Sequence, residues 1–258
     1  MSATLASARA FVSNADLPAP RALLGDDAST IDVAFDTATQ QAAVVGSDVV
    51  SFVTEITPEQ RSDIVNSTLL AQLVAKKKHP LPADITGVIA WYDTYFDVLS
   101  NIGFVIQDQG FAEYTENADT FEAHEAILEV ARVALAGAPG ALALVIKTLE
   151  SLKKMDADSP WITLFNRESR SANTARFQVT IAEQDAKEGL IIRLLAFGLQ
   201  ANAKITQVLF FRLKHNEATL HHHSGKISIN PAVLAGVRDD VARKISAFTK
   251  DFVAGLDL

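Results

Sequence analysis

The feature that most constrains the fold is an apolar segment whose side chains do not alternate. Residues 205–213 read Ile-Thr-Gln-Val-Leu-Phe-Phe-Arg-Leu and are predicted to form a strand. Successive side chains of a strand point to opposite faces, so a sheet with one face in water needs alternating apolar and polar residues. Val208, Leu209, Phe210 and Phe211 do not alternate. Such a strand must be covered on both faces, and helices are the natural cover.

A second apolar segment supplies helices of that kind. Between Glu129 and Lys147 the sequence carries one charged residue, Arg132. We predict a helical hairpin over residues 119–136 and 141–154, with a flexible joint of small residues between Gly137 and Gly140. Each half is too short to cross a bilayer alone.

The rest of the chain alternates between helical and strand patterns. The pair Thr57-Pro58 is typical of a capped helix start and opens a helix over 58–77, which is followed by a second helix over 83–100. From Trp161 onward the apolar period changes to two. The predicted strands are 31–35, 49–56, 176–181, 190–199, 205–214 and 226–230, and a last helix covers 231–254.

Composition favours one large domain. The chain has 258 residues, 48% of them hydrophobic, and no linker-like segment divides it. Residues 1–29 are rich in Ala, Ser, Asp and Pro and are predicted to be a flexible N-terminal arm, with the single domain over 30–258. The net charge of −8 argues against a nucleic-acid partner. The start of the chain lacks the apolar run of a signal peptide, so we expect a protein made in soluble, cytoplasmic form.

The search for catalytic or metal-binding residues gives one cluster, His221-His222-His223. On a strand, His221 and His223 share a face and could bind a metal together, but no further ligand is spaced to complete the site. The favoured interpretation is a polar, solvent-facing edge beside a turn at Ser224-Gly225. The chain has no cysteine, no glycine-rich phosphate loop and no Gly-x-Ser-x-Gly motif. We therefore expect no catalytic residue, metal or cofactor, and a histidine-centred metal-dependent enzyme remains an alternative.

The C-terminal half resembles the Cyt family of δ-endotoxin cytolysins. The similarity is carried by Trp161-Ile162, Arg167-Glu168-Ser169, the strand 176–185 and the segment Gln207-Val-Leu-Phe-Phe211. Residues 127–132 are similar to the third helix of the family. The resemblance covers about residues 120–235. The triple histidine and a charged last helix depart from the family pattern.

The resemblance implies an α/β fold of the α+β type, in which two helical hairpins wrap a mostly antiparallel sheet as a three-layer α-β-α sandwich. It also implies a soluble protoxin, often dimeric, that is trimmed at its ends and acts on membrane lipid without a protein receptor. In the family's favoured model the helices swing away and the strands enter the bilayer and oligomerise, and carpeting of the membrane is the competing model.

We therefore predict a membrane-damaging, pore-forming cytolysin that is released or secreted and then acts at the target cell membrane. Its expected partners are the phospholipid bilayer and further copies of itself. The inserting strands would be 176–183, 190–199 and 205–214. The resemblance gives membrane-insertion and functional-charge candidates and a hinge: Arg167, Glu168, Gln207, Val208, Leu209, Phe210, Phe211 and Lys226, with Gly137 and Gly140. A non-lytic lipid- or partner-binding protein on the same fold is the other alternative.

Overall fold

The computed structural model describes residues 4–20, 36, 38, 41–53, 55–80, 82–106, 110–114, 120–156, 159–209, 212–214 and 218–256. Within them the helices are α1 (Leu5–Asn14), α2 (Pro58–Lys78), α3 (Ile85–Asn101), α4 (Ala123–Ala134), α5 (Pro139–Lys154), α6 (Pro160–Ser169), α7 (Pro231–Ile245) and α8 (Thr249–Phe252). The strands are β1 (Ala42–Val45), β2 (Asp48–Phe52), β3 (Phe104–Ile106), β4 (Ala112–Tyr114), β5 (Thr120–Glu122), β6 (Arg170–Ser171), β7 (Thr174–Asp185), β8 (Gly189–Ala201), β9 (Arg212–Lys214), β10 (Ala218–Ile229) and β11 (Val253–Leu256).

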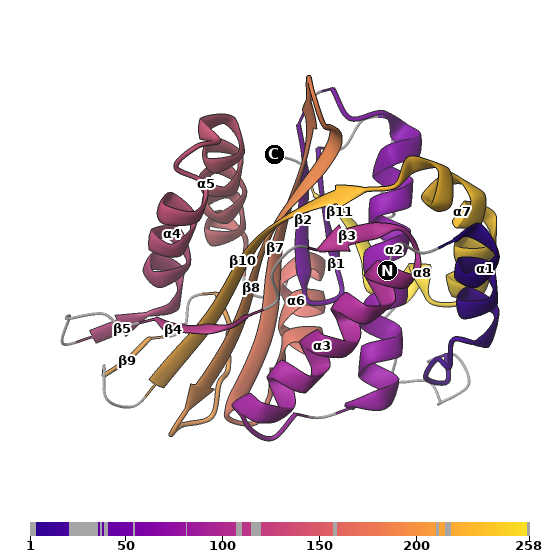
Figure 1. The fold of residues 1–258 in the computed structure, drawn as a ribbon. Coiled ribbons are helices and arrows are strands. Elements are labelled where there is room, and N and C mark those ends of the chain that lie inside the picture. Colours follow the sequence, from indigo (N-terminus) through magenta and orange to yellow (C-terminus); the bar gives the residue numbers. More distant parts are fainter. Residues whose placement is uncertain are drawn as a thin grey trace.

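Nine of these strands form one sheet in the order β11-β1-β2-β7-β8-β10-β3, with β4 also pairing with β10 and β6 with β7. The pairings are antiparallel except that between β2 and β7, which is parallel. β5 and β9 pair with each other in a separate two-stranded sheet. Figure 1 shows the long strands β7, β8 and β10 running through the middle of the molecule.

Helices cover both faces of this sheet, as the sequence predicts (Figure 1). One core lies between the sheet and the helices α1, α2, α3 and α7. We call these four helices the α2–α3 layer. The other lies between the sheet and α4, α5 and α6, and we call α4 and α5 the α4–α5 layer. The predicted single-domain, three-layer α+β fold is therefore confirmed, with its two helical hairpins on opposite faces.

The α2–α3 layer starts its helices with side-chain caps. Thr57 and Gln60 form the predicted capping box at α2, and Asp84 caps α3 through the N–H of Gly87. α3 then presents Trp91 and Tyr92 to the sheet, both fully buried. Aromatic rings on one helix stripe bury a large apolar area, which anchors this layer.

The predicted strand over 205–214 is wrong for residues 205–209, which have an irregular path. Val208 is nevertheless fully buried, so its apolarity reflects core packing rather than a two-faced strand. Its backbone N–H donates to Asn166 Oδ1 at 3.0 Å instead of to a neighbouring strand. The third long strand is β10, for which the sequence pattern predicts strand only from residue 226.

Two further segments differ from the prediction. Residues 160–169 form α6 rather than a strand, because Ser159 caps a helix with Pro160 at its first position. Residues 5–14 form α1, with Ala8 and Val12 buried against the rest of the molecule, where the sequence predicts a flexible arm. The predicted strand at 31–35 lies outside the described residues.

Candidate functional site

The longest antiparallel pair is the β7–β8 hairpin, with strands of 12 and 13 residues that pair along their whole length. Asp185 closes its turn, since Oδ1 accepts the backbone N–H groups of Lys187 at 2.8 Å and Glu188 at 2.9 Å. The bonds from Glu188 and then Lys187 lower the pKa of the Asp185 carboxyl. Gly189 follows with φ of 74°, a conformation that glycine adopts without strain.

The face of this hairpin toward α4 and α5 is apolar. Phe177 and Phe197 lie at its centre with their rings stacked at 4.9 Å, and Phe165 of α6 packs edge-on against Phe177 at 6.2 Å. The other buried apolar residues of this face are Ala175, Val179, Ile181, Leu195 and Leu199. The two strands therefore carry an apolar surface under the α4–α5 layer, which ends toward the turn at the ion pair of Glu183 and Arg193 on the same face.

The opposite face of β7 is polar and equally buried. Arg176, Gln178 and Thr180 point toward the α2–α3 layer, next to Asp48 of β2. Asp48 Oδ2 accepts hydrogen bonds from Thr180 Oγ1 at 2.7 Å and Gln178 Nε2 at 3.3 Å. Complete burial raises the pKa of the Asp48 carboxyl to about 7, because the charged form loses its water, and the bond from Thr180 opposes this shift.

Arg176 connects this polar face to α3 and α6. Its guanidinium lies over the Trp91 ring, 4.3 Å from the ring centroid, and donates to the backbone oxygen of Glu168 at 2.8 Å. Burial lowers the pKa of Arg176. Tyr92 Oη donates to the backbone oxygens of Phe177 at 2.8 Å and Phe197 at 3.2 Å. Burial raises the pKa of the Tyr92 phenol.

α2 holds the sheet in a similar way. Gln72 Nε2 donates to the Val45 oxygen at 2.6 Å, and Gln72 Oε1 accepts the Ser47 N–H at 3.0 Å. Gly46 lies between them with φ of 57°, and a Cβ there would come within 2.4 Å of Gln72 Oε1. α2 and α3 are therefore both bonded to strand backbone through buried side chains.

The α4–α5 layer meets the sheet through apolar side chains. Among the described residues, the polar contacts of this layer with the sheet include Ser51 Oγ with Thr148 Oγ1 at 3.0 Å in the core. Tyr114 Oη donates to Glu129 Oε2 at the exposed edge. The hydroxyl pair joins two side chains, so it does not involve the backbone hydrogen bonds between strands.

The candidate charges Arg167 and Glu168 lie together at a junction between helices. The Glu168 side chain is 3% exposed and pairs with Lys76 of α2 at 2.6 Å and with Arg167 at 3.0 Å. Arg167 also donates to the Asp251 oxygen at 2.5 Å. This network joins α6 to α2 and α8. Arg167 and Glu168 therefore hold helices together instead of forming an exposed charged surface.

Of the candidate residues 207–211, the described ones, Gln207, Val208 and Leu209, do not lie in a strand. Val208 and Leu209 are buried in the core on the α4–α5 side, and Gln207 is half-buried. Arg170 donates to the backbone oxygens of Ile205 at 3.3 Å and Thr206 at 2.5 Å, which fixes the irregular path. Phe210 and Phe211 lie outside the described residues.

Lys226 lies apart from these residues, on β10, where it pairs with Glu188 of the β7–β8 turn. It also lines a small cavity of about 110 Å³, shared with Ala134 and Leu135 at the end of α4. The predicted hinge glycines are close by in sequence. Gly137 lies in the turn after α4 and Gly140 in the first turn of α5, and a Cβ at either would meet nothing within 4 Å.

The histidines lie on a central strand and not on a solvent-facing edge, because β10 pairs with β8 on one side and with β3 and β4 on the other. His223 is buried toward α3, with Nδ1 2.9 Å from the Gly110 oxygen and its ring against Phe96. His222 faces the other layer, and burial followed by the charges of His223 and His221 lowers its pKa. Across the described residues no group of three His, Cys, Asp or Glu side chains is placed to hold a metal ion.

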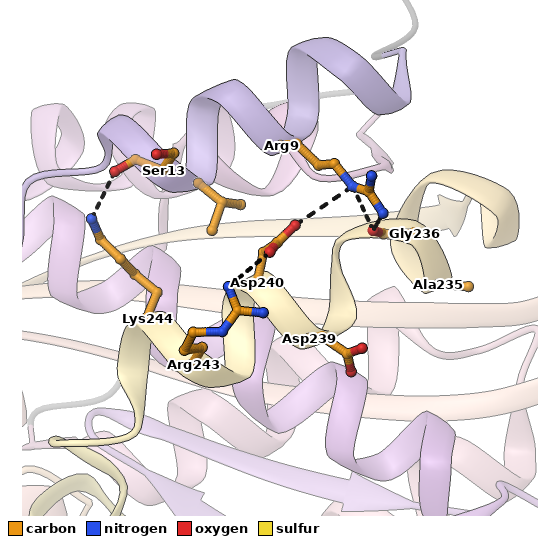
Figure 2. A pocket seen from close by; sticks show the side chains of 9 residues that line it. Arg9, Ser13, Ala235, Gly236, Asp239, Asp240, Arg243 and Lys244 are labelled. Atoms are coloured by element: carbon orange, nitrogen blue, oxygen red, sulfur yellow. Dashed lines mark hydrogen bonds and ion pairs between the residues drawn. The ribbon is translucent and has the colours of Figure 1, made fainter.

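A cavity of about 890 Å³ lies between α1 and α7 (Figure 2). Arg9 reaches across it to the Gly236 oxygen at 3.1 Å and to Asp240 at 3.6 Å, and Lys244 donates to the Ser13 oxygen at 3.0 Å. These polar groups bind one another and the helix backbone. The cavity therefore marks how α1 is attached, and Arg9, Asp240 and Lys244 are used in that attachment.

Sequence reasoning missed the polar face of β7 and its partner Asp48. The signal was present, since Thr174, Arg176, Gln178 and Thr180 alternate with apolar residues, and Asp48 interrupts an apolar run. A lone carboxylate inside a buried strand needs hydrogen-bond partners, which a polar neighbouring strand supplies.

No helix in the described part of the chain combines the length and apolarity needed to cross a membrane. No protein-family model and no curated protein matches the sequence. Among solved structures, the chain is similar to a delta-endotoxin, at a TM-score of 0.34 and 14% identity over 72% of this chain and 84% of that chain. It is also similar to the Evf virulence factor, at a TM-score of 0.36 and 10% identity over 82% of this chain and 85% of that chain.

A third similar structure is the activated Cyt2Ba monomer from Bacillus thuringiensis subsp. israelensis, at a TM-score of 0.24 and 11% identity over 65% of this chain and 81% of that chain. The Cyt family, which the sequence resembles, is thus represented among the structures similar to this chain.

Proposed function

We propose that this protein is a membrane-damaging, pore-forming cytolysin that acts directly on lipid bilayers. The observation that carries the proposal is the apolar face of the β7–β8 hairpin, which is buried under a helical layer that is attached mainly by apolar contacts. Lipid tails are as apolar as the helices they would replace, so the sheet can exchange one cover for the other at little net cost.

The α4–α5 layer is the one that leaves. Its departure uncovers Phe177, Phe197 and their apolar neighbours, and the contact it breaks in the core, between Ser51 and Thr148, joins two side chains. A strand of about 9–11 residues crosses a bilayer, and β7 and β8 have 12 and 13. These two strands contain 176–183 and 190–199, which are predicted from the sequence as inserting strands, and the third predicted segment, 205–214, is left out of the proposal.

Several chains must act together in the membrane. A strand edge that faces lipid leaves N–H and C=O groups without partners, which is costly in the absence of water. The proposed partners are therefore phospholipid and further copies of this chain, with no catalytic residue or cofactor in the mechanism. The protein would be made in soluble form and act at the membrane of the target cell.

One observation favours a non-lytic lipid- or partner-binding protein as a second candidate. β10 places His222, Ser224, Lys226 and Ser228 on the same side as the apolar face of β7 and β8. Apart from Leu220, which belongs to the same core, the apolar surface therefore ends at β10, which limits how much sheet enters lipid. In this case the uncovered face would bind a bilayer without crossing it.

A disulfide between β2 and α5 distinguishes both candidates from a protein whose α4–α5 layer never leaves the sheet. Ser51 Oγ and Thr148 Oγ1 lie 3.0 Å apart, and the chain has no other cysteine, so Ser51→Cys with Thr148→Cys is well placed to form one bond. We expect the oxidised protein to release no dye from phosphatidylcholine vesicles and the reduced protein to release it like wild type.

The two single-cysteine variants are the matched controls, and both should leak vesicles under oxidising conditions. Equal leakage by the oxidised and reduced double variant would show that the α4–α5 layer stays in place during lysis. Vesicle binding without dye release by the wild type would favour the non-lytic candidate.

A further inference from the structure

The end of the α4–α5 hairpin is an uncharged, exposed surface. We call residues 133–146 the hairpin tip, and no charged residue occurs in it. Val133 is 77% exposed, against 44% for Val105 and 39% for Leu5, which are the other large hydrophobic residues exposed in the described part of the chain. A valine in this position contacts water at nearly full area, which is unfavourable in solution.

The rest of the tip extends the same apolar character. Its exposed residues besides Val133 are Ala136, Gly137, Pro139, Gly140 and Ala143, and its half-buried residues include Leu142, Leu144 and Ile146. Single exposed apolar residues need no explanation, but a group of them at one end of a hairpin marks an interaction surface.

Charged residues of both signs lie at the base of the tip, with Glu129 and Glu150 exposed one turn further from it. Arg132 precedes it and Lys147 follows it, and both are exposed. The N-terminus of α5, at Ala138, has no side-chain cap, like those of α4 and α8, whereas α1, α2, α3, α6 and α7 each have one. An uncapped helix start presents unpaired N–H groups and a partial positive charge to its surroundings.

Apolar side chains ahead of charged groups, of which Arg132 and Lys147 are the nearest in sequence, match the layering of a zwitterionic phospholipid surface, where the headgroups lie above the acyl boundary. We propose that the hairpin tip is the site at which the folded protein first contacts a phospholipid bilayer. The tip enters the headgroup–acyl boundary while Arg132, Lys147 and the start of α5 meet lipid phosphates. This inference rests on the proposed function, because it names where that bilayer is first met.

Docking at the tip also places the bilayer against the layer that must move. The tip belongs to the α4–α5 layer, and the cavity of about 110 Å³ beneath Ala134 and Leu135 separates it from β8 and β10. Fewer contacts form around a cavity, which weakens the attachment of the layer at this end. Separation would begin at the membrane and proceed along the hairpin.

A single-site label tests the contact directly. Because the chain has no cysteine, Ala136→Cys carries an environment-sensitive dye at one position, and Ala232→Cys on α7 is the exposed control. With phosphatidylcholine vesicles we expect blue-shifted emission and shallow quenching for the tip label and no change for the control. An unchanged tip label on vesicle-bound protein would overturn the inference.

A charge in the tip tests its energetic role. A Cβ at Gly137 meets nothing within 4 Å, so Gly137→Asp should fold normally, and Ala232→Asp is the matched control. We expect roughly tenfold weaker vesicle binding for the first and no change for the second. Equal binding by both would contradict the proposal.

The two proposals fail separately. Tip-dependent vesicle binding without dye release would keep the docking site and overturn pore formation. Dye release with an unchanged tip label, or unaffected by Gly137→Asp, would keep pore formation and overturn the docking site. A protein that binds no phosphatidylcholine vesicle would overturn both.

Discussion

On one face of the sheet, α2 and α3 bond to strand backbone through Gln72 and Tyr92, whereas on the other face α4 and α5 pack through apolar side chains and a hydroxyl pair. The helices of the first layer have side-chain caps, and α5 has none. The two layers bury the same sheet, but they are attached to it by different interactions.

This difference decides which layer can be exchanged for lipid. An apolar contact with a helix has a close equivalent in a contact with an acyl chain. A hydrogen bond from a buried side chain to a strand has no such equivalent, because breaking it leaves both partners unsatisfied. The comparison therefore predicts that α2 and α3 stay on the sheet while α4 and α5 leave.

The largest expected effect concerns the ionisation of Asp48 beneath the α2–α3 layer. Its pKa of about 7 in the folded protein exceeds the ordinary 3.8, so the folded state binds the extra proton between these values. The stability contributed by the protonated form is fully present below about pH 4 and is lost as pH rises through about 7. We expect wild type to lose about 3 kcal/mol between pH 5 and pH 8.

Asp48→Asn should remove this loss, which urea unfolding at the two pH values measures. Parallel pH dependence in wild type and variant would show that Asp48 is not the titrating group and that the α2–α3 layer is less dry than its burial indicates.

The next effect comes from the charge network of Glu168. Glu168→Gln leaves Lys76 and Arg167 without their carboxylate, and we expect a loss of about 2 kcal/mol in the free energy of unfolding. The loss stays below that of a fully buried pair because both cations retain some water. Glu150→Gln on the exposed side of α5 is the control and should change stability little. Similar values for the two variants would contradict the buried network.

A direct comparison of the layers follows from their hydrogen bonds. Tyr92→Phe removes a donor to two strand carbonyls and should lower the free energy of unfolding by about 1–2 kcal/mol. Ser51→Ala with Thr148→Val removes both partners of the α5 contact and should cost less than about 1 kcal/mol while accelerating vesicle leakage. A larger loss of stability for the Ser51/Thr148 double variant than for Tyr92→Phe would contradict the difference between the two layers.

The smallest expected effect concerns the N-terminal segment. α1 packs on α7, within the α2–α3 layer and away from the layer that we propose to leave. A chain that starts at Ser29 should therefore leak vesicles at least as fast as the full chain, with a modest loss of thermal stability from the exposed partners of Ala8 and Val12. Slower leakage of the shortened chain would show that α1 contributes to lysis.

The sequence predicts the layers better than it predicts individual strands. Helical periodicity and the caps at Thr57 locate α2 and α3, and the charge-free stretch around Gly137 locates the α4–α5 hairpin. The apolar residues Val208 and Leu209 led to a wrong strand prediction, because a buried irregular segment and a buried strand have the same apolar composition. Periodicity reports burial and leaves the choice of backbone path open.

The candidate site shows the same limit. Arg167 and Glu168 are found by resemblance, and their role as an ion-pair junction depends on Lys76, which lies 92 residues from Glu168 in the chain. The histidines were expected at a solvent-facing edge, but β3 and β4 cover that side of β10. Pairing between distant segments is set by tertiary packing, which no local pattern contains.

The outer strand pair has a consequence for biosynthesis. β1 is hydrogen-bonded to β11, so Ala42 must find Leu256 across most of the chain. At about 5–20 residues per second, a ribosome takes on the order of 10–40 s to make the intervening segment. During that interval the β1 edge of a nascent chain is unpaired, a state in which strands recruit wrong neighbours. A cell that makes this protein would therefore benefit from a chaperone on the nascent chain until β11 emerges.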